Sequence, residues 1–236
     1  MKTPLFYFLP LLYLCFACNQ VPQVAKTTPV SNEWLTFQGN DKGKKIVLIS
    51  GDEEYRSEEA LPQLAKILAT HHGFDCTVLF AQTPEQPGIV QPNYQHHIPG
   101  LEALQDADLV ILFTRFRALP DTQMAHIHQY LLAGKPIIGI RTATHAFHFK
   151  DSTNQYAHWG NYYEKEGDEW QGGFGRLVLG ERWHTHHGHH KHQSTKGIIA
   201  PEAAQHPILS GISTGDIWGA TTCMAFDYRC CPTCSP

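Results

Sequence analysis

The chain has 236 residues, of which 42% are hydrophobic and 17% are charged, a composition typical of a globular protein and not of a disordered or fibrous one. Its formal net charge at pH 7 is −4, and its 18 Lys and Arg residues are spread along the sequence. Because nucleic-acid-binding surfaces need clustered positive charge, we expect no nucleic-acid partner.

The first 18 residues have the pattern of an export signal. Lys2 precedes an apolar run from 5 to 17, which Pro10 interrupts. A bilayer-spanning helix needs about 20 apolar residues, so this run predicts a signal peptide and not a span. Its end resembles the lipobox of bacterial lipoproteins, in which the cysteine, here Cys18, carries the lipid; Phe16 departs from that pattern. We therefore expect an exported, lipid-anchored protein facing the periplasm or the cell surface, with plain secretion and an uncleaved anchor as the alternatives.

Residues 19–43 are polar, contain prolines and show no sustained apolar period, which predicts a tether between the membrane and the folded domain. The domain is expected over 44–220.

From Lys44 onward, short apolar runs alternate with helical patterns. The runs, each expected to form a strand, cover 44–50, 76–80, 108–113 and 136–140. The first helix is predicted to begin between Ser57 and Pro62 and to end before Gly73. A short helix over 101–106 and a longer one over 120–134 follow. Continuous apolar strands separated by helices indicate an α/β fold with a parallel sheet and helices on both faces.

Charged and polar residues follow the ends of three of these strands, where parallel sheets place their ligands. They are Asp52, Glu53, Glu54 and Arg56 after the first strand, Arg115 and Arg117 after the third, and Arg141, Thr142, Thr144, His145 and His148 after the fourth. We expect these segments to meet at one site. Arg141 directly follows a buried strand, so its guanidinium needs an anionic partner, for which Glu53 and Glu54 are the candidates.

The segment PIIGIRTATHAF, residues 136–147, resembles the strand, tight turn and helix that carry the nucleophilic cysteine of class I glutamine amidotransferases, whose pattern is GxCxGH. Gly139 and Ile140 fit the pattern, but Arg141 stands where the cysteine would be. We therefore expect no amidotransferase activity.

A fuller resemblance is to the ThuA-like family, named for trehalose utilisation, a relative of that fold without the cysteine. The segments GDEEYRSEEALP, FTRFRALP, GIRTATHAF, GGFGRLVLGERW, HHGHH and HPIL are similar to its bacterial lipoprotein-type members, over about 44–219. The resemblance implies a flavodoxin-like, mostly parallel sheet and a role in sugar metabolism, on trehalose or a related disaccharide or keto-sugar.

The histidine-rich segment HTHHGHHKH, residues 184–192, allows three interpretations. If it is extended, His184 and His186 share one face and can bind a zinc ion together with a further ligand. Alternatively it is a lid that supplies neutral imidazoles such as His187 for proton transfer, or a plain surface loop. No cofactor is required, and a divalent metal such as zinc is the alternative.

Two function hypotheses follow. In the first, the protein is an enzyme, hydrolase-like or isomerase-like, that acts on a small carbohydrate through acid/base chemistry. Its expected catalytic residues are His145, His187 and Glu53. Its expected substrate-binding residues are Asp52, Arg56, Arg115, Arg117, Arg141, Thr142, Trp159 and Trp170, the tryptophans by stacking on sugar rings unless they anchor a loop to the core. In the second, a surface lipoprotein binds sugar with the same groups without catalysis.

The last residues, 221–236, do not continue the ThuA-like pattern. They contain Cys223, Cys230, Cys231 and Cys234, and in an exported protein such a cluster favours disulfides over zinc. We expect this tail to be a frameshifted or truncated ending.

Overall fold

The computed structural model describes residues 33–39, 43–187, 192–219 and 223–226. The predicted signal peptide with Cys18, most of the tether, the centre of the histidine-rich segment and most of the cysteine-rich tail lie outside the described residues. No helix within the described part of the chain combines the length and the apolar character needed to cross a bilayer.

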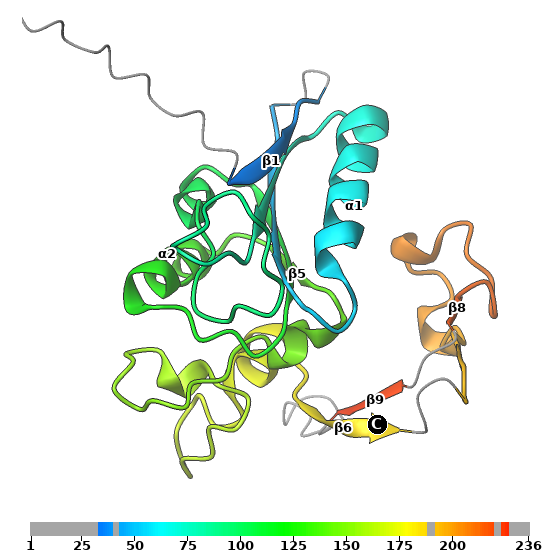
Figure 1. Cartoon of the computed structure of the whole chain (residues 1–236). Helices are drawn as coiled ribbons and strands as arrows, with labels where there is room; N and C mark the ends of the chain where they lie inside the picture. The colour runs from blue at the N-terminus through cyan, green and yellow to red at the C-terminus, as the bar shows by residue number, and fades with distance from the viewer. Residues whose placement is uncertain (1–32, 40–42, 188–191, 220–222, 227–236) are drawn as a thin grey trace, which may run out of the picture. The chain divides into compact units, whose positions relative to one another are not determined.

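The protein is built on a five-stranded mixed sheet with the order β1-β3-β2-β4-β5 (Figure 1). Four strands are parallel: β2 (Lys45–Gly51), β3 (Asp75–Phe80), β4 (Leu109–Thr114) and β5 (Ile137–Gly139). The predicted α/β fold with a mostly parallel sheet is thus confirmed. Continuous apolar runs predicted these strands because both faces of a covered parallel sheet are buried.

The edge strand β1 (Trp34–Phe37) pairs antiparallel with β3. It lies within the segment predicted to be a tether, so the folded domain begins earlier than expected. A four-residue strand at the edge of a sheet carries too short a pattern to be recognised from sequence.

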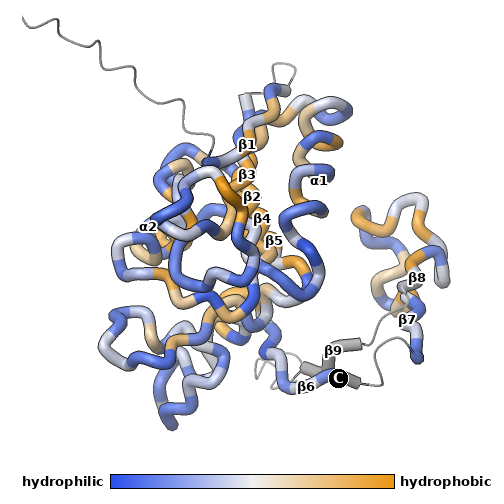
Figure 2. Tube along the Cα trace, in the orientation of Figure 1, coloured by the Kyte–Doolittle hydropathy of each residue, from blue (hydrophilic) through white to orange (hydrophobic). Residues whose placement is uncertain are grey.

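Helix α1 (Ser57–His72) covers one face of the sheet and α2 (Asp121–Leu132) the other. Alternate residues of β2 show the two layers. Ile46 and Leu48 pack in one core cluster with Leu61 of α1, whereas Val47 and Ile49 belong to a second cluster that contains Met124 and Ile127 of α2. Figure 2 shows the apolar strands between the two helices.

Short elements complete the described chain. The helical turns are η1 (Leu101–Gln105), η2 (Arg141–His145), η3 (Ala157–Trp159), the π-helical η4 (Gly175–Leu179), η5 (Pro201–Ala203) and η6 (Pro207–Leu209). Two antiparallel pairs join β6 (Trp183–His187) to β9 (Cys223–Phe226) and β7 (Thr195–Lys196) to β8 (Trp218–Gly219). The helix suggested after the fourth strand by the amidotransferase resemblance is the single turn η2.

The glycine-rich segment before η4 packs its backbone directly against η2. A Cβ atom on Gly175 would lie 1.9 Å from the carbonyl oxygen of Thr144 and 2.7 Å from that of Glu181. Because these are backbone atoms, they cannot move aside without shifting η2 itself. The absence of a side chain at residue 175 therefore fixes the position of the turn that follows β5.

We predict that Gly175→Ala lowers the free energy of unfolding by about 3 kcal/mol, since the added methyl overpacks a backbone contact. Gly180→Ala is the matched control. Gly180 has a φ of 84° and nothing within 4 Å of an added Cβ, so only the left-handed conformation penalises it, by about 1 kcal/mol. Chemical denaturation of both purified variants measures the difference. Equal losses would show that the contact with Thr144 does not constrain the turn.

Candidate functional site

The carboxyl edge of the sheet carries unusual backbone conformations. Arg56, Phe116 and Arg141 have φ values of 54°, 49° and 49°, and within the described ranges they are the non-glycine residues with positive φ. They follow β2, β4 and β5 respectively, at the same edge. Such conformations cost roughly 1–3 kcal/mol each and concentrate at functional sites. The carboxyl edge of the sheet is therefore the candidate functional site.

The strand order marks a position on this edge. The chain passes from β2 to β3 on one side and then crosses to β4 on the other side of β2. In open parallel sheets a ligand crevice opens where the order reverses in this way. Glu53 and Arg115 stand after the two strands that flank the reversal, β2 and β4.

Asp52 ties the loop after β2 to η2. Its side chain is fully buried; Oδ1 accepts hydrogen bonds from the amides of Glu54 and Tyr55 at 2.7 and 2.8 Å, and Oδ2 accepts one from the hydroxyl of Thr142, which is also fully buried. Both residues were predicted to bind substrate. In the structure they have a different role: neither side chain is accessible to a ligand, and the two are hydrogen-bonded to each other inside the protein.

Glu53 joins two of the predicted arginines. Its carboxylate forms ion pairs with Arg115 and with the fully buried Arg117. Arg117 also donates to the carbonyls of Arg115, Pro92 and Tyr94 at 2.8, 2.9 and 2.8 Å. Burial lowers the pKa of Arg117, and the nearby carboxylates of Glu53 and Asp52 oppose that change.

These contacts alter two predicted roles. The carboxylate of Glu53, predicted to be catalytic, is held by two guanidinium groups, which leaves it poorly placed to move protons. Arg117, predicted to bind substrate, is fully enclosed and uses its donors within the protein. Both residues hold loops together at the carboxyl edge.

Among the described residues, neither Glu53 nor Glu54, the partners proposed from the sequence, forms an ion pair with Arg141. Its guanidinium lies 4.1 Å from the centre of the Tyr55 ring and donates to the Tyr55 hydroxyl at 2.8 Å. Arg56, in contrast, is exposed and forms an ion pair with Glu59 one turn along α1. Arg56 is thus directed to a surface pair, and no contact joins it to the other predicted site residues within the described chain.

Aromatic and imidazole rings gather after β4 and η2. This ring cluster comprises Phe116, His145, His148, Tyr162, Trp183 and His186. Ring centroids lie 4.9 Å apart for Phe116 and His145, and 4.6 Å apart for His145 and Trp183. The guanidinium of Arg115 lies 4.9 Å from the centre of Phe116. The cluster therefore combines flat apolar faces with hydrogen-bonding nitrogens beside a positive charge.

The ring cluster also shows which functional candidates were missed. Phe116 and Trp183 were not assigned to the site, although Phe116 stands between the two arginines of FTRFRALP. That position directly after a strand was the available signal for Phe116.

His145 is held as a neutral imidazole. Its side chain is 2% exposed, and burial lowers its pKa to about 3, with Arg115, His186 and Arg141 lowering it further. At neutral pH it therefore carries no positive charge. A neutral imidazole can still donate one hydrogen bond and accept another.

The tryptophans predicted to stack on sugars pack elsewhere. Trp159 is 1% exposed and stacks on Trp170 at 5.0 Å and on Phe174 at 5.4 Å, with interplanar angles of 10° and 28°. These contacts take up its ring, so Trp159 anchors a loop to the core. Trp170 is partly buried against the same core cluster, and its ring also meets that of His158 edge-on, with the centroids 4.8 Å apart.

The predicted metal ligands lie on β6. The pairing of β6 with β9 is irregular between Trp183 and Thr185, which breaks the simple alternation assumed for His184 and His186. His184 is exposed, while the ring of His186 packs against that of Trp183, with the two centroids 5.6 Å apart. In the part of the chain that the structure describes, no three His, Cys, Asp or Glu side chains are grouped to hold a metal ion. The side chain of His187 and residues 188–191 lie outside that part, so a zinc site stays a prediction.

Neither a protein-family model, nor a curated protein, nor a solved structure matches the chain.

We predict that Thr142→Val lowers the free energy of unfolding by about 2 kcal/mol, because a buried carboxylate loses a hydrogen-bond donor while the side-chain volume is kept. Thr70→Val, on the exposed face of α1, is the control and should change stability by no more than about 0.5 kcal/mol. Denaturant unfolding of the two variants tests this. A Thr142→Val protein as stable as the control would mean that Asp52 does not depend on that hydroxyl.

The low pKa of His145 predicts a pH-dependent stability. In the unfolded chain a histidine binds a proton below about pH 6.5, whereas folded His145 does so only near pH 3. Stability is therefore retained above pH 6.5 and lost as the pH falls towards 3, with a limiting slope of about 1.4 kcal/mol per pH unit. The His145→Gln variant should lose less stability than the parent between pH 7 and pH 5 in denaturant unfolding. Parallel pH profiles would contradict a neutral, buried His145.

Proposed function

We propose that this protein acts on a carbohydrate at the carboxyl edge of the sheet, with the ring cluster and the guanidinium groups of Arg115 and Arg141 forming the substrate site. The observation that carries the proposal is the meeting of these groups around His145. Flat rings suit the apolar face of a sugar, and the two arginines suit its oxygens.

The charge at this site favours a substrate that develops negative charge. Arg115 and Arg141 both lower the pKa of His145, so both act electrostatically on the position where its ring lies. The same positive charges would stabilise an oxyanion on a bound substrate. A keto-sugar whose carbonyl becomes an enediolate fits this environment. The proposed reaction class is proton transfer next to a carbonyl, an isomerase-like step.

A hydrolytic reaction fits the described site less well. Glycoside hydrolysis uses a pair of carboxyl groups, one on each side of the bond. Near the ring cluster, the described carboxylates of Glu53 and Glu54 are both paired with Arg115. The pair is therefore committed to the protein's own structure.

In this proposal His145 is a neutral hydrogen-bonding group that orients a hydroxyl or carbonyl, as a group with a pKa of about 3 cannot serve as an acid at neutral pH. Proton transfer then belongs to a second imidazole, for which His187 is the candidate, on β6 beside His186. Zinc would be an alternative partner for the histidine-rich segment.

The fold agrees with the resemblance on which the sugar assignment rests. The parallel strands have the order β3-β2-β4-β5, which is the order of the first four strands of a flavodoxin-like sheet. Arg141 has a positive φ at the place where the amidotransferase turn carries its cysteine. We therefore infer a ThuA-like domain, carried by an exported chain with a lipid on Cys18.

The test is substrate turnover by purified protein with a panel of disaccharides and keto-sugars. Product analysis is made in D2O, where proton transfer next to a carbonyl incorporates deuterium into the sugar. Arg141→Gln should lower kcat/KM about 100-fold, because a charge that stabilises the transition state is removed. Lys66→Gln, an exposed change on α1, is the control and should leave kcat/KM unaltered.

The second candidate is a sugar-binding lipoprotein without catalysis. It is favoured by the number of titratable groups that are already engaged. Asp52 accepts hydrogen bonds from Thr142 and two backbone amides, and Glu53 pairs with Arg117. Sugar binding that Arg141→Gln weakens, with neither product nor deuterium incorporation, would select this candidate. The absence of both binding and turnover would contradict the two proposals together.

A further inference from the structure

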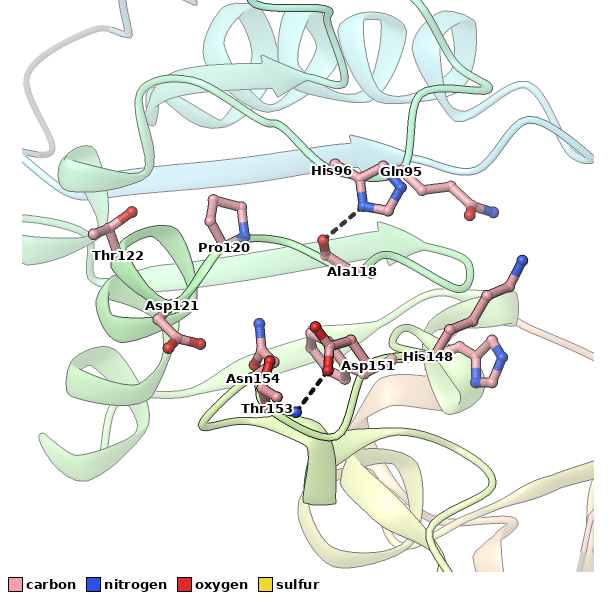
Figure 3. A pocket seen from close by; sticks show the side chains of 12 residues that line it. Gln95, His96, Ala118, Pro120, Asp121, Thr122, His148, Asp151, Thr153 and Asn154 are labelled. Carbon is pink, nitrogen blue, oxygen red and sulfur yellow. Dashed lines mark hydrogen bonds between the residues drawn. The ribbon is translucent and has the colours of Figure 1, made fainter.

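A pocket of about 460 Å³ opens at the start of α2 and has the strand-end residue His148 in its lining (Figure 3). We call it the α2 pocket; its walls include His96, Asp121, Thr122, Phe149, Asp151 and Asn154. They come from the loop after β3, from the first turn of α2 and from the segment after η2. A volume of this size lies within the range of small-molecule sites.

The walls of the α2 pocket are formed before any ligand arrives. The Nδ1 atom of His96 lies 3.0 Å from the carbonyl oxygen of Ala118, and the Asn154 amide donates to the carbonyl of Leu119 at 3.1 Å. Arg117 holds the preceding loop through the carbonyls of Pro92 and Tyr94. Because these hydrogen bonds already order the loops, ligand binding loses little conformational entropy in ordering them.

The charge of the pocket argues against an anionic ligand. The lining contains two carboxylates, those of Asp121 and Asp151, one lysine, Lys150, and no arginine. Each carboxylate is fixed by a backbone amide: Asp121 accepts from Gln155 at 3.0 Å and Asp151 from Thr153 at 2.8 Å. The bonds from Thr153 lower the pKa of Asp151, so it is ionised at neutral pH.

A wholly apolar ligand is also a poor fit, because it would displace water from the carboxylate, amide and imidazole groups without replacing the hydrogen bonds that the water makes. The pocket nevertheless has apolar walls. Phe149 is held by stacking on Phe147 at 6.4 Å, and Pro120 and Ala118 complete this surface. In Figure 3, His96 and Asp121 belong to different walls of the pocket around Pro120 and Ala118. Apolar surface surrounded by fixed acceptors and donors matches a neutral ring with several hydroxyl groups.

The α2 pocket borders the ring cluster without being part of it. His148 lines the pocket, and its ring lies 5.1 Å from that of Tyr162 and 5.9 Å from that of Phe116. Arg115, Arg141 and His145 are not among the residues that line the pocket. The two regions thus share a wall and differ in charge.

We propose that the α2 pocket is a second carbohydrate site, which binds a neutral hexopyranose through Asp121, Asp151 and Asn154 with its apolar face towards Phe149 and Pro120. This site shares His148 with the ring cluster but contains none of Arg115, Arg141 and His145, so its binding can be tested separately from turnover. It assigns to the protein a non-catalytic sugar-binding function in addition to the proposed reaction.

The test uses purified protein and three probes: the methyl glycosides of glucose, galactose and mannose. Binding is followed by amide chemical shifts in NMR titrations to about 20 mM, a range that detects millimolar dissociation constants. We expect at least one probe to shift the amides of Thr122 and Asp151. Asp121→Asn keeps an oxygen for the Gln155 amide and should weaken that binding about tenfold, because a charge-assisted hydrogen bond is lost.

Further variants localise the effect. Thr122→Trp places a large side chain at an exposed position of the wall and should abolish binding. Asp106→Asn, an equally conservative change at an exposed carboxylate outside the pocket, is the matched control and should leave the dissociation constant within about twofold.

Two outcomes would overturn the second site. One is that no probe binds, or that only a charged molecule such as spermidine or glucuronate does. The other is that Thr122→Trp binds the sugar as tightly as the parent. Arg141→Gln separates this proposal from the proposed reaction, because it should lower turnover and leave probe binding at the α2 pocket intact.

Discussion

The carboxyl edge of the sheet depends on one constraint: two charged side chains, Asp52 and Arg117, are completely removed from water and must be paired inside the protein. For a buried ion pair such as that of Arg117 with Glu53, removing one partner typically costs about 3–5 kcal/mol. Asp52 therefore fixes the loop after β2 to η2, and Arg117 fixes the segment after β4 to the loop that follows β3. Glu53 joins the two arrangements through Arg115 and Arg117. Three loops from distant parts of the chain are thereby held in one arrangement.

Much of the sheet could be predicted from sequence, because β2, β3 and β4 are buried on both faces and each therefore has a nearly continuous apolar run. The edge strand β5 was predicted from its apolar residues although Ile138 is 50% exposed. The meeting of the strand ends follows from the same logic, since parallel strands end on one edge. The roles of individual residues could not be predicted in this way. Asp52, Arg117 and Trp159 have the side chains of binding residues, yet all three are buried, and burial depends on contacts with segments far away in sequence. The composition of a loop does not show which of its charged side chains form hydrogen bonds and ion pairs within the protein and which can bind a ligand.

Phe116 illustrates the opposite error. Its left-handed backbone turns a phenylalanine towards the histidines and Trp183, and a positive φ at a bulky residue is not visible in sequence. The strain at Phe116 and Arg141 persists because hydrogen bonds on either side determine the backbone. The Phe116 amide donates to the carbonyl of His145 at 3.0 Å, and the Arg117 amide donates to that of Ala146 at 2.7 Å.

The buried network also explains why two neighbouring regions have different electrostatic character. Burial is the main cause of the low pKa of His145 in the ring cluster, and Arg115 and Arg141 lower that pKa further. Arg117 donates to the carbonyl groups of Pro92 and Tyr94 and pairs with Glu53, and it is not among the residues that line the α2 pocket. The charged residues of that pocket are Asp121, Asp151 and Lys150. His148 belongs to both regions. Burial and the nearby Lys150 lower its pKa, so its imidazole is mainly uncharged at neutral pH. In the two functions that we propose, a substrate with developing negative charge and a neutral sugar would occupy adjacent places, because Arg117, whose charge would otherwise act on both ligands, is enclosed within the fold.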